Sequence, residues 1–138
     1  MAISPGQPSE PTDKTQALFD HDNDTGRVAT ISMQGLSGAG AFFTRWLSQM
    51  PNDITRHIKL VDPGVPDRGS DNVSFICHGV PAFSLSSVSW DYETYTWHTN
   101  RDTFDKLILD DLKNNAALFA MLATWRLRMP SAFRGSHE

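Results

Sequence analysis

Several features that mark particular classes of protein are missing from this chain of 138 residues. Cys77 is the only cysteine, which excludes an internal disulfide and a cysteine-based zinc cluster. No apolar run approaches the roughly 20 residues that cross a membrane as a helix, so no membrane partner is expected. The segment 1–15 lacks the basic start and apolar core of a secretory signal peptide. The cellular location is therefore left open.

Charge and glycine patterns exclude two further classes of protein. The net charge is −4 and no basic block occurs, which argues against nucleic acid as a partner. Gly35, Gly38 and Gly40 do not form a dinucleotide-binding fingerprint. Hydrophobic residues make up 39% of the chain and charged residues 20%, which is typical of one globular domain with a hydrophobic core.

The chain divides into one predicted domain between two tails. Pro5, Pro8 and Pro11 lie among small polar residues, so we predict a flexible tail over 1–16. The domain is expected over 17–129 and a second tail over 130–138. A short apolar run predicts a strand at 17–19, and alternating patterns predict strands at 27–33, 55–61 and 80–86. Helical spacing and capping residues predict helices at 38–50, 70–78 and 103–128.

Two of the predicted helices have apolar stripes. The stripe of the first helix consists of Phe42, Phe43, Trp46, Leu47 and Met50. The stripe of the last helix consists of Phe104, Ile108, Leu112, Phe119 and Leu122, and we expect Asp102 or Thr103 to cap that helix. Cys77 is expected to be a core residue of the short helix between them, where it lies in an apolar stretch.

Three stretches contain residues that could bind a metal or a substrate. Asp20, Asp22 and Asp24 follow the first strand, where they could form a turn or bind a ligand at the strand end. Asp71 starts a helix and is expected, on chemistry alone, to serve the helix dipole. His98 lies in a loop, where it could be a surface residue or a metal ligand. The dense aromatics Trp90, Tyr92, Tyr95 and Trp97 could line a substrate pocket or form a small satellite core.

The order and spacing of these stretches resemble the last part of a zinc-peptidase family. The matching motifs are Asp20–Gly26 after a strand, Ser70-Asp71-Asn72-Val73-Ser74-Phe75 with Gly79-Val80-Pro81, and His98-Thr99-Asn100-Arg101-Asp102-Thr103. They are similar to the two-zinc exopeptidases that include bacterial leucyl aminopeptidase and carboxypeptidase Q. The resemblance extends over about Ala17 to Trp125. This chain departs from the pattern at Asn72, where the family usually has histidine.

The resemblance implies a fold and a set of roles. The fold would be α/β, a three-layer arrangement of a sheet with flanking helices, equivalent to the C-terminal half of a zinc exopeptidase domain. Asp22 and His98 would be zinc ligands, and Asp102 would be an acid that orients His98. Trp90, Tyr92, Tyr95, Trp97 and Asp71 would line the pocket for a peptide substrate.

The resemblance also implies that most of the metal site is missing. In the family, the first histidine, the bridging aspartate and a Glu-Glu pair lie upstream of the segment that this chain matches. Asp22 and His98 alone fall short of the three or more protein ligands that zinc sites use. We therefore expect a truncated peptidase relative that has no catalytic activity by itself.

The rival interpretation is a non-catalytic interaction module derived from the same fold. Either way, we expect self-association or pairing with a missing N-terminal half. The surfaces expected to be exposed are the 17–19 strand and one side of the Phe42, Phe43 and Trp46 helix.

Overall fold

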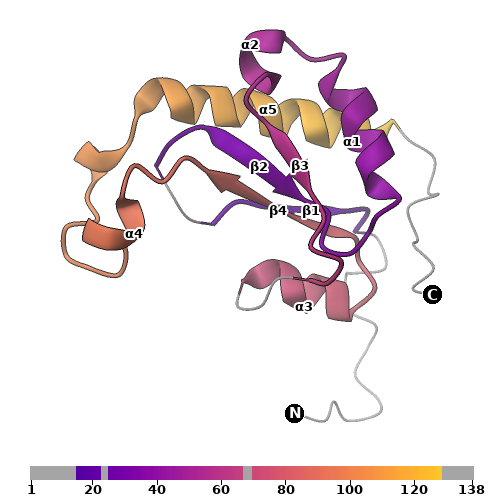
Figure 1. Ribbon diagram of the computed structural model, residues 1–138, viewed down its shortest axis with the longest axis horizontal. Helices are drawn as coiled ribbons and strands as arrows, with labels where there is room; N and C mark the ends of the chain where they lie inside the picture. The colour runs from indigo at the N-terminus through magenta and orange to yellow at the C-terminus, as the bar shows by residue number, and fades with distance from the viewer. Residues whose placement is uncertain (1–14, 23–24, 67–69, 129–138) are drawn as a thin grey trace.

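The protein is built around a four-stranded mixed β-sheet. The computed structural model describes residues 15–22, 25–66 and 70–128 (Figure 1). The strands are β1 (Leu18–Asp20), β2 (Val28–Ser32), β3 (Lys59–Val61) and β4 (Ala82–Ser87). Their order across the sheet is β1-β4-β2-β3. β1 is parallel to β4, β2 is parallel to β3, and β2 and β4 are antiparallel.

All four predicted strands are present, although β3 is shorter than the sequence pattern suggests. The first part of the predicted 55–61 strand is taken up by the end of a short helix, α2 (Asn52–Thr55), and by the turn after it. Pro51 precedes α2 and its carbonyl accepts hydrogen bonds from the N–H groups of Ile54 and Thr55. This local helical turn competes with extended backbone, which begins only at Lys59.

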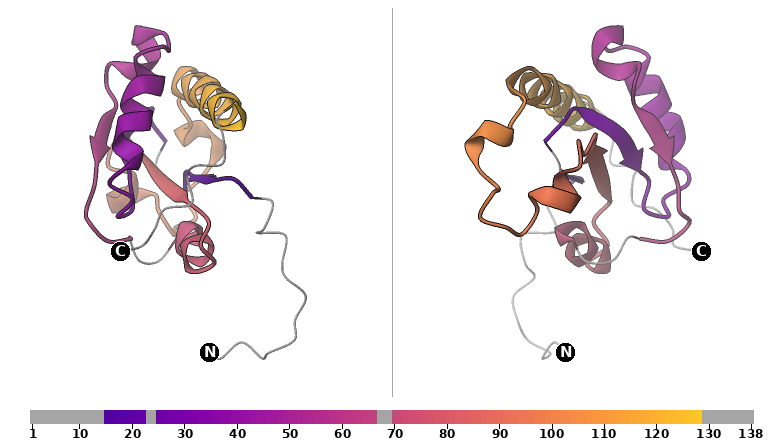
Figure 2. Two further views of the ribbon diagram at one scale, coloured as in Figure 1. Left: turned by 90° about the vertical axis from the view of Figure 1, so that its right-hand side faces the viewer. Right: turned by 60° about the vertical axis from the view of Figure 1, so that its left-hand side comes forward.

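Helices cover both faces of the sheet. α1 (Ala39–Leu47) and α5 (Leu109–Leu127) pack on one face, whereas α3 (Asp71–Cys77) contacts β1 and β4 from the other side (Figure 2). A further short helix, α4 (Tyr92–Tyr95), follows β4 at one end of the molecule. The predicted fold class, an α/β sheet flanked by helices, is confirmed.

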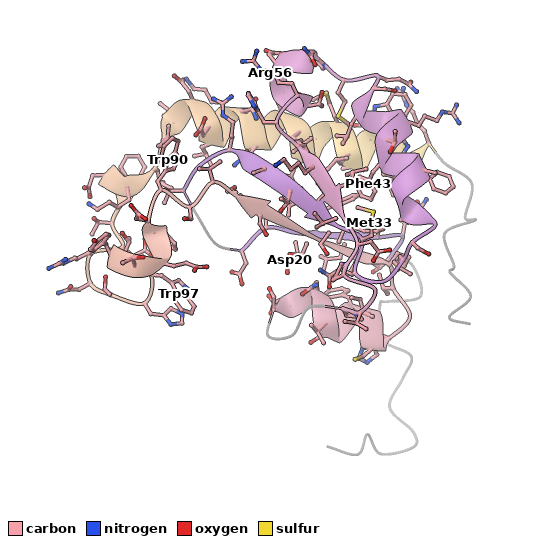
Figure 3. The ribbon with its side chains drawn as sticks, viewed as in Figure 1. Asp20, Met33, Phe43, Arg56, Trp90 and Trp97 are labelled. Carbon is pink, nitrogen blue, oxygen red and sulfur yellow. The ribbon has the colours of Figure 1, made fainter. Side chains whose placement is uncertain are left out.

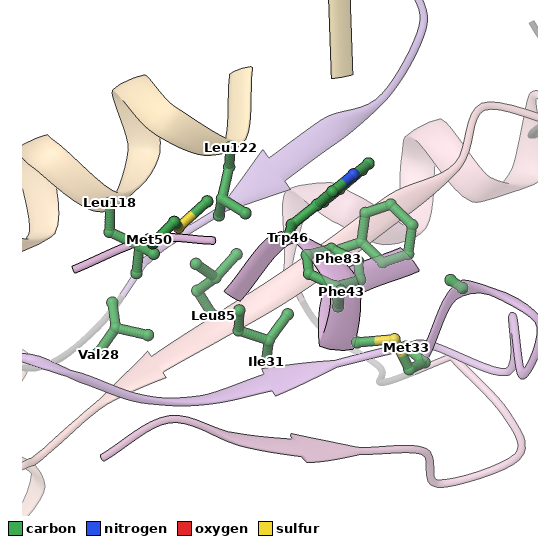
Figure 4. Packing of buried hydrophobic residues seen from close by; sticks show 11 residues of the cluster. Val28, Ile31, Met33, Phe43, Trp46, Met50, Phe83, Leu85, Leu118 and Leu122 are labelled. Atoms are coloured by element: carbon green, nitrogen blue, oxygen red, sulfur yellow. The ribbon is translucent and has the colours of Figure 1, made fainter. Parts of the chain in front are cut away.

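The main hydrophobic core lies between the sheet and the α1 and α5 helices (Figure 4). Its buried members are Val28, Ile31, Met33, Ala39, Phe43, Trp46, Met50, Phe83, Leu85, Leu118 and Leu122. Ile31 and Leu85 are paired across β2 and β4, so the two strands present the same face to the helices. The expectation that the aromatic side of α1 is exposed is wrong, because Phe43 and Trp46 are fully buried in this core.

The last helix differs from its prediction at its start and in its buried face. A 3₁₀ turn, η2 (Phe104–Lys106), comes first, and α5 begins only at Leu109. Neither Asp102 nor Thr103 therefore caps it, since its N-cap position is Ile108. Phe104 is 83% exposed, and Ile108 and Leu112 are also exposed. The face that packs inward consists of Asp111, Asn115, Leu118, Leu122 and Arg126.

Two further expectations concern Cys77 and the tails. Cys77 is exposed, because it lies on the outer side of α3 near the C-terminus of that helix. Its predicted place in the core is wrong.

The predicted tails fall outside the described residues apart from Thr15 and Gln16, and the Gln16 carbonyl accepts a hydrogen bond from Arg126. Burial lowers the pKa of Arg126. No described helix is long and apolar enough to span a membrane.

Candidate functional site

Alternation along the short β1 strand places Phe19 and Asp20 on opposite faces of the sheet. Phe19 packs toward the main core, where its ring stacks on that of Phe83. Successive side chains of a strand point to opposite faces, so Asp20 faces α3. Asp20 lies between the strands and α3 in Figure 3. Asp22 follows two residues later and is exposed.

Asp20 and Asp22 meet at the start of α3. The Ser70 hydroxyl lies 2.8 Å from Asp20 Oδ2 and 3.2 Å from Asp22 Oδ2, and it donates to this pair of carboxylates. The Asn72 backbone N–H donates to Asp20 Oδ2 at 3.4 Å. Ser70 therefore joins two acids of the β1 end instead of capping its own helix. Asp20 and Ser70 were not among the predicted site residues, although strand alternation could have identified Asp20.

Asn72 is the residue of α3 with the most unusual environment. Its exposed fraction is 0%, and neither its Oδ1 nor its Nδ2 has a hydrogen-bond partner among the described residues. Leaving a buried polar group without a partner costs about 1–3 kcal/mol. Asp71, the predicted pocket residue beside it, is exposed in the first turn of α3. Its role toward a substrate stays a prediction.

The loop that carries His98 has a strained backbone. Trp90, Asp91 and His98 have φ angles of 48°, 61° and 57°, in the left-handed region that residues other than glycine seldom adopt. Conformations of this kind cluster at functional sites. The exposed His98 ring stacks on the ring of Trp97, with centroids 4.0 Å apart and planes 22° apart. Trp97 lies beside α4 in Figure 3.

A hydrogen bond between Tyr92 and Asp102 joins the two ends of this loop. The Tyr92 hydroxyl donates to Asp102 Oδ2 at 2.6 Å, and the Tyr92 carbonyl accepts the N–H groups of Thr96 and Trp97. The structure thus assigns Asp102 a tyrosine partner, while its predicted role as the acid that orients His98 stays a prediction. Farther along, hydrogen bonds from Lys106 and then Thr103 lower the pKa of Asp105 to about 2.

The predicted pocket aromatics lie mostly at the surface. Trp90, Tyr95 and Trp97 are exposed, and only Tyr92 is partly buried. They therefore do not form the closed satellite core that was one interpretation of their density. Exposed aromatic surface remains available for contacts, and the pocket role stays a prediction.

His21 lies between the two acids in sequence but faces the other way. Its Nε2 is 2.6 Å from the Ser87 hydroxyl, and its ring centroid is 5.5 Å from that of Phe119 on α5. This contact ties the end of β1 to the end of β4 on the face covered by α5. Asp20 and His21 thus hold the end of β1 on both faces of the sheet.

Asp22 and His98 both follow the carboxyl ends of two parallel, neighbouring strands. Asp22 comes after β1, and His98 comes after β4 by way of α4. Asp22 contacts Ser70 and His98 contacts Trp97, and no hydrogen bond joins the two candidate ligands to each other. Within the described ranges, no three or more His, Cys, Asp or Glu side chains are grouped so as to hold a metal ion. These residues alone do not fit a complete zinc site.

Comparison with known proteins places the chain in a family. A family model described as Peptidase family M28 matches residues 3–123. This range contains the β1 acids, α3 and the His98 loop, and it reaches into the last turns of α5. No curated protein and no solved structure matches the chain significantly.

Proposed function

Because the chain belongs to peptidase family M28, we propose that it contributes part of the metal site of a zinc-dependent exopeptidase of the two-zinc aminopeptidase and carboxypeptidase Q type. Asp22 and His98 are the proposed zinc ligands. The remaining ligands and the general base would come from outside the described residues. The main support is the family match across most of the chain, which includes both proposed ligands.

The donor chemistry of the two residues agrees with this proposal. Carboxylate oxygen and imidazole nitrogen are common zinc ligands. Asp22 and His98 are both exposed at the surface, where a metal bound with other ligands could reach them. Ser70 donates to Asp22 and leaves its second carboxylate oxygen free of a described hydrogen bond. Asp102, Trp97 and the neighbouring aromatics are the proposed wall on the His98 side, with peptide as the substrate class.

A zinc titration followed by NMR tests the two proposed ligands separately. In the full-length chain we expect zinc to shift the His98 ring signals and the Asp22 backbone amide before those of other histidines and aspartates. His98→Ala should abolish the first effect and Asp22→Asn the second. His57→Ala is the matched control, because His57 is exposed and has Arg56 as its described partner. A zinc response dominated by His57 or His78 would contradict the assignment.

The same samples also address catalysis. We expect no zinc-dependent release of amino-terminal residues from peptide substrates by this polypeptide alone, since two ligands do not hold a catalytic zinc ion. Turnover that His98→Ala abolishes would mean that further ligands lie within the chain.

A second candidate function is that of a non-catalytic interaction module with the same fold. It is favoured by the apolar side chains exposed between η2 and the first turns of α5, which are Phe104, Leu107, Ile108, Leu109 and Leu112. Contiguous apolar surface is typical of protein–protein contact sites. The occupant of this surface would be a second copy of the chain or an amino-terminal peptidase half.

A further inference from the structure

The buried face of α5 begins with two polar side chains where apolar ones would be expected. Asp111 and Asn115 are each only 5% exposed. They lie one turn apart and precede Leu118 and Leu122 on the same face of the helix. Burying polar groups is costly unless their hydrogen bonds are satisfied. The partners of these two side chains therefore show what this end of α5 is built to hold.

Asn115 binds the backbone on both sides of Arg27. Its Oδ1 accepts the Val28 N–H at 2.8 Å, and its Nδ2 donates to the Gly26 carbonyl at 3.0 Å. One amide side chain thus fixes one donor and one acceptor of a segment far away in sequence. That segment joins the loop containing Asp22 to the start of β2.

Asp111 holds the side chain of the residue between them. Its Oδ1 accepts a hydrogen bond from Arg27 Nε at 3.0 Å and lies 2.8 Å from Arg27 Nη2, with which it forms an ion pair. Asp111 is buried, whereas Arg27 is partly exposed. Charge-assisted hydrogen bonds of this kind are stronger than neutral ones. Together, Asp111 and Asn115 form a clamp on Gly26–Val28, called here the α5 clamp.

The clamped segment is hydrogen-bonded to Val88, where the loop leading to His98 begins. The Gly26 N–H donates to the Val88 carbonyl at 3.1 Å, and the Val88 N–H donates to the Arg27 carbonyl at 3.0 Å. A Cβ on Gly26 would lie 2.5 Å from the Val88 carbonyl oxygen and 2.7 Å from Trp90 Nε1. Glycine is therefore required for this close approach. The Gly26–Val28 segment and Val88 are held together by these two backbone hydrogen bonds.

The pairing of β2 with β4 is irregular at the same place. Its register shifts between Val28 and Thr30, directly after the clamped residues. A bulge at a strand end bends the chain and redirects the residues that precede it. The α5 clamp therefore holds Gly26–Val28 at the start of β2 and, through them, Val88 at the start of the segment that leads to His98.

We propose that Asp111 and Asn115 are positioning residues that fix the spacing of the two loops carrying Asp22 and His98. They act through Gly26–Val28 and Val88, and they touch neither candidate ligand. The positioning claim concerns the loops themselves, and its relevance to zinc rests on the proposed function. The clamp is therefore tested first without metal and then with it.

The first test compares backbone amide signals and amide hydrogen exchange in metal-free, full-length variants. Asn115→Leu keeps the side-chain volume and removes both hydrogen bonds. We expect shifted amide signals across 20–28 and 88–98, and exchange of the Val28 and Val88 amides faster by about tenfold or more. Asp110→Asn is the matched control, because Asp110 is exposed on the same turn and has Lys113 as its described partner.

A purely structural role would have a different signature. If Asn115 only stabilised the whole protein, exchange would accelerate equally at Ile31, Leu85 and the two loops. An Asn115→Leu spectrum that differs from that of Asp110→Asn only near α5 would also overturn the proposal. If Asn115→Leu does not fold, Arg27→Lys replaces it, since lysine keeps the charge and loses the two-nitrogen contact with Asp111. It should shift the same amides by a smaller amount.

The second test adds zinc to the same variants. In Asn115→Leu we expect the zinc-induced shifts at His98 and at the Asp22 amide to fall severalfold relative to the Asp110→Asn control. Metal-free shifts with unchanged zinc shifts would show that the clamp positions the loops without influencing metal binding. A parent chain with no zinc shifts at all would contradict the proposed function, while the metal-free comparison would still decide the role of the clamp.

Discussion

At the scale of single residues, two buried asparagines have opposite energetic roles. Asn115 satisfies its amide with two backbone hydrogen bonds, whereas the Asn72 amide has no partner in the part of the chain that the structure describes. Removing both members of a hydrogen bond can be nearly neutral, but stranding one buried partner costs free energy. Replacing Asn115 strands the Val28 N–H and the Gly26 carbonyl. Replacing Asn72 strands no described group, because the amide itself is the unsatisfied one.

Leucine substitutions at these two positions should therefore change stability in opposite directions. We expect Asn72→Leu to raise the free energy of unfolding by about 1–3 kcal/mol, which is the desolvation cost of an unpaired buried polar group. Asn115→Leu should lower it by about 2–4 kcal/mol, because two backbone groups lose their partners. Urea denaturation of both variants measures the difference. A loss of stability in Asn72→Leu would mean that its amide has a partner that the described residues do not include.

Residue chemistry also explains why parts of the site could be predicted and others could not. Asp22 and His98 lie in short polar motifs whose residue types and spacing are visible in the sequence. Ser70 was visible as a helix start, but its hydrogen bonds to Asp20 and Asp22 depend on how α3 packs against β1. The clamp by Asp111 and Asn115 depends on contacts across most of the chain, which no local pattern encodes.

At the scale of elements, the last helix shows where periodicity misleads. Phe104, Ile108 and Leu112 recur at helical spacing, but the chain is 3₁₀ and then extended before Leu109. The true inward face includes Asp111, Asn115 and Arg126, and a search for apolar stripes passes over these polar residues. Strand positions were easier to predict, because alternation in β2 and β4 directly reflects one face packed against α1 and α5.

Two leucines of α5 offer a direct test of which face is buried. Leu118→Ala should destabilise the protein by about 2–5 kcal/mol, because it leaves a cavity in the fully buried core. Leu112→Ala should change the unfolding free energy by about 0.5 kcal/mol or less, because that side chain is exposed. Chemical denaturation compares the two variants under identical conditions. Equal losses would show that Leu112 is covered by another molecule in solution.

At the scale of the whole molecule, unpaired strand edges and exposed apolar side chains occur together. In the described part of the chain β1 pairs only with β4, and β3 pairs only with β2. The η2–α5 segment adds Phe104, Leu109 and Leu112 as exposed apolar side chains. Unpaired edges template association, and apolar patches mark contact sites. The surface prediction for α1 was wrong because Phe43 packs against Phe19 and Phe83 of the sheet, a contact that sequence alone does not reveal.

We therefore expect the folded chain to self-associate or to bind a hydrophobic dye. Size-exclusion chromatography with light scattering measures the first property, and dye fluorescence measures the second. A reducing agent is needed, because the exposed Cys77 could otherwise link two chains. A double variant, Phe104→Ser with Leu109→Ser, should reduce both self-association and dye fluorescence without changing the melting temperature. A monomer that binds no dye and melts cooperatively would favour a complete, independent binding module over a peptidase part.

The parallel pairing of β1 with β4 also constrains the order of folding. β1 lies near the start of the described chain, but β4 follows β2, α1, β3 and α3 in the sequence. Closing so long a loop costs conformational entropy before any strand contact is gained. Among the described strands, β1 has no partner to join during synthesis until Ala82–Ser87 has left the ribosome. The acids at its end therefore reach their native positions only after most of the sheet exists.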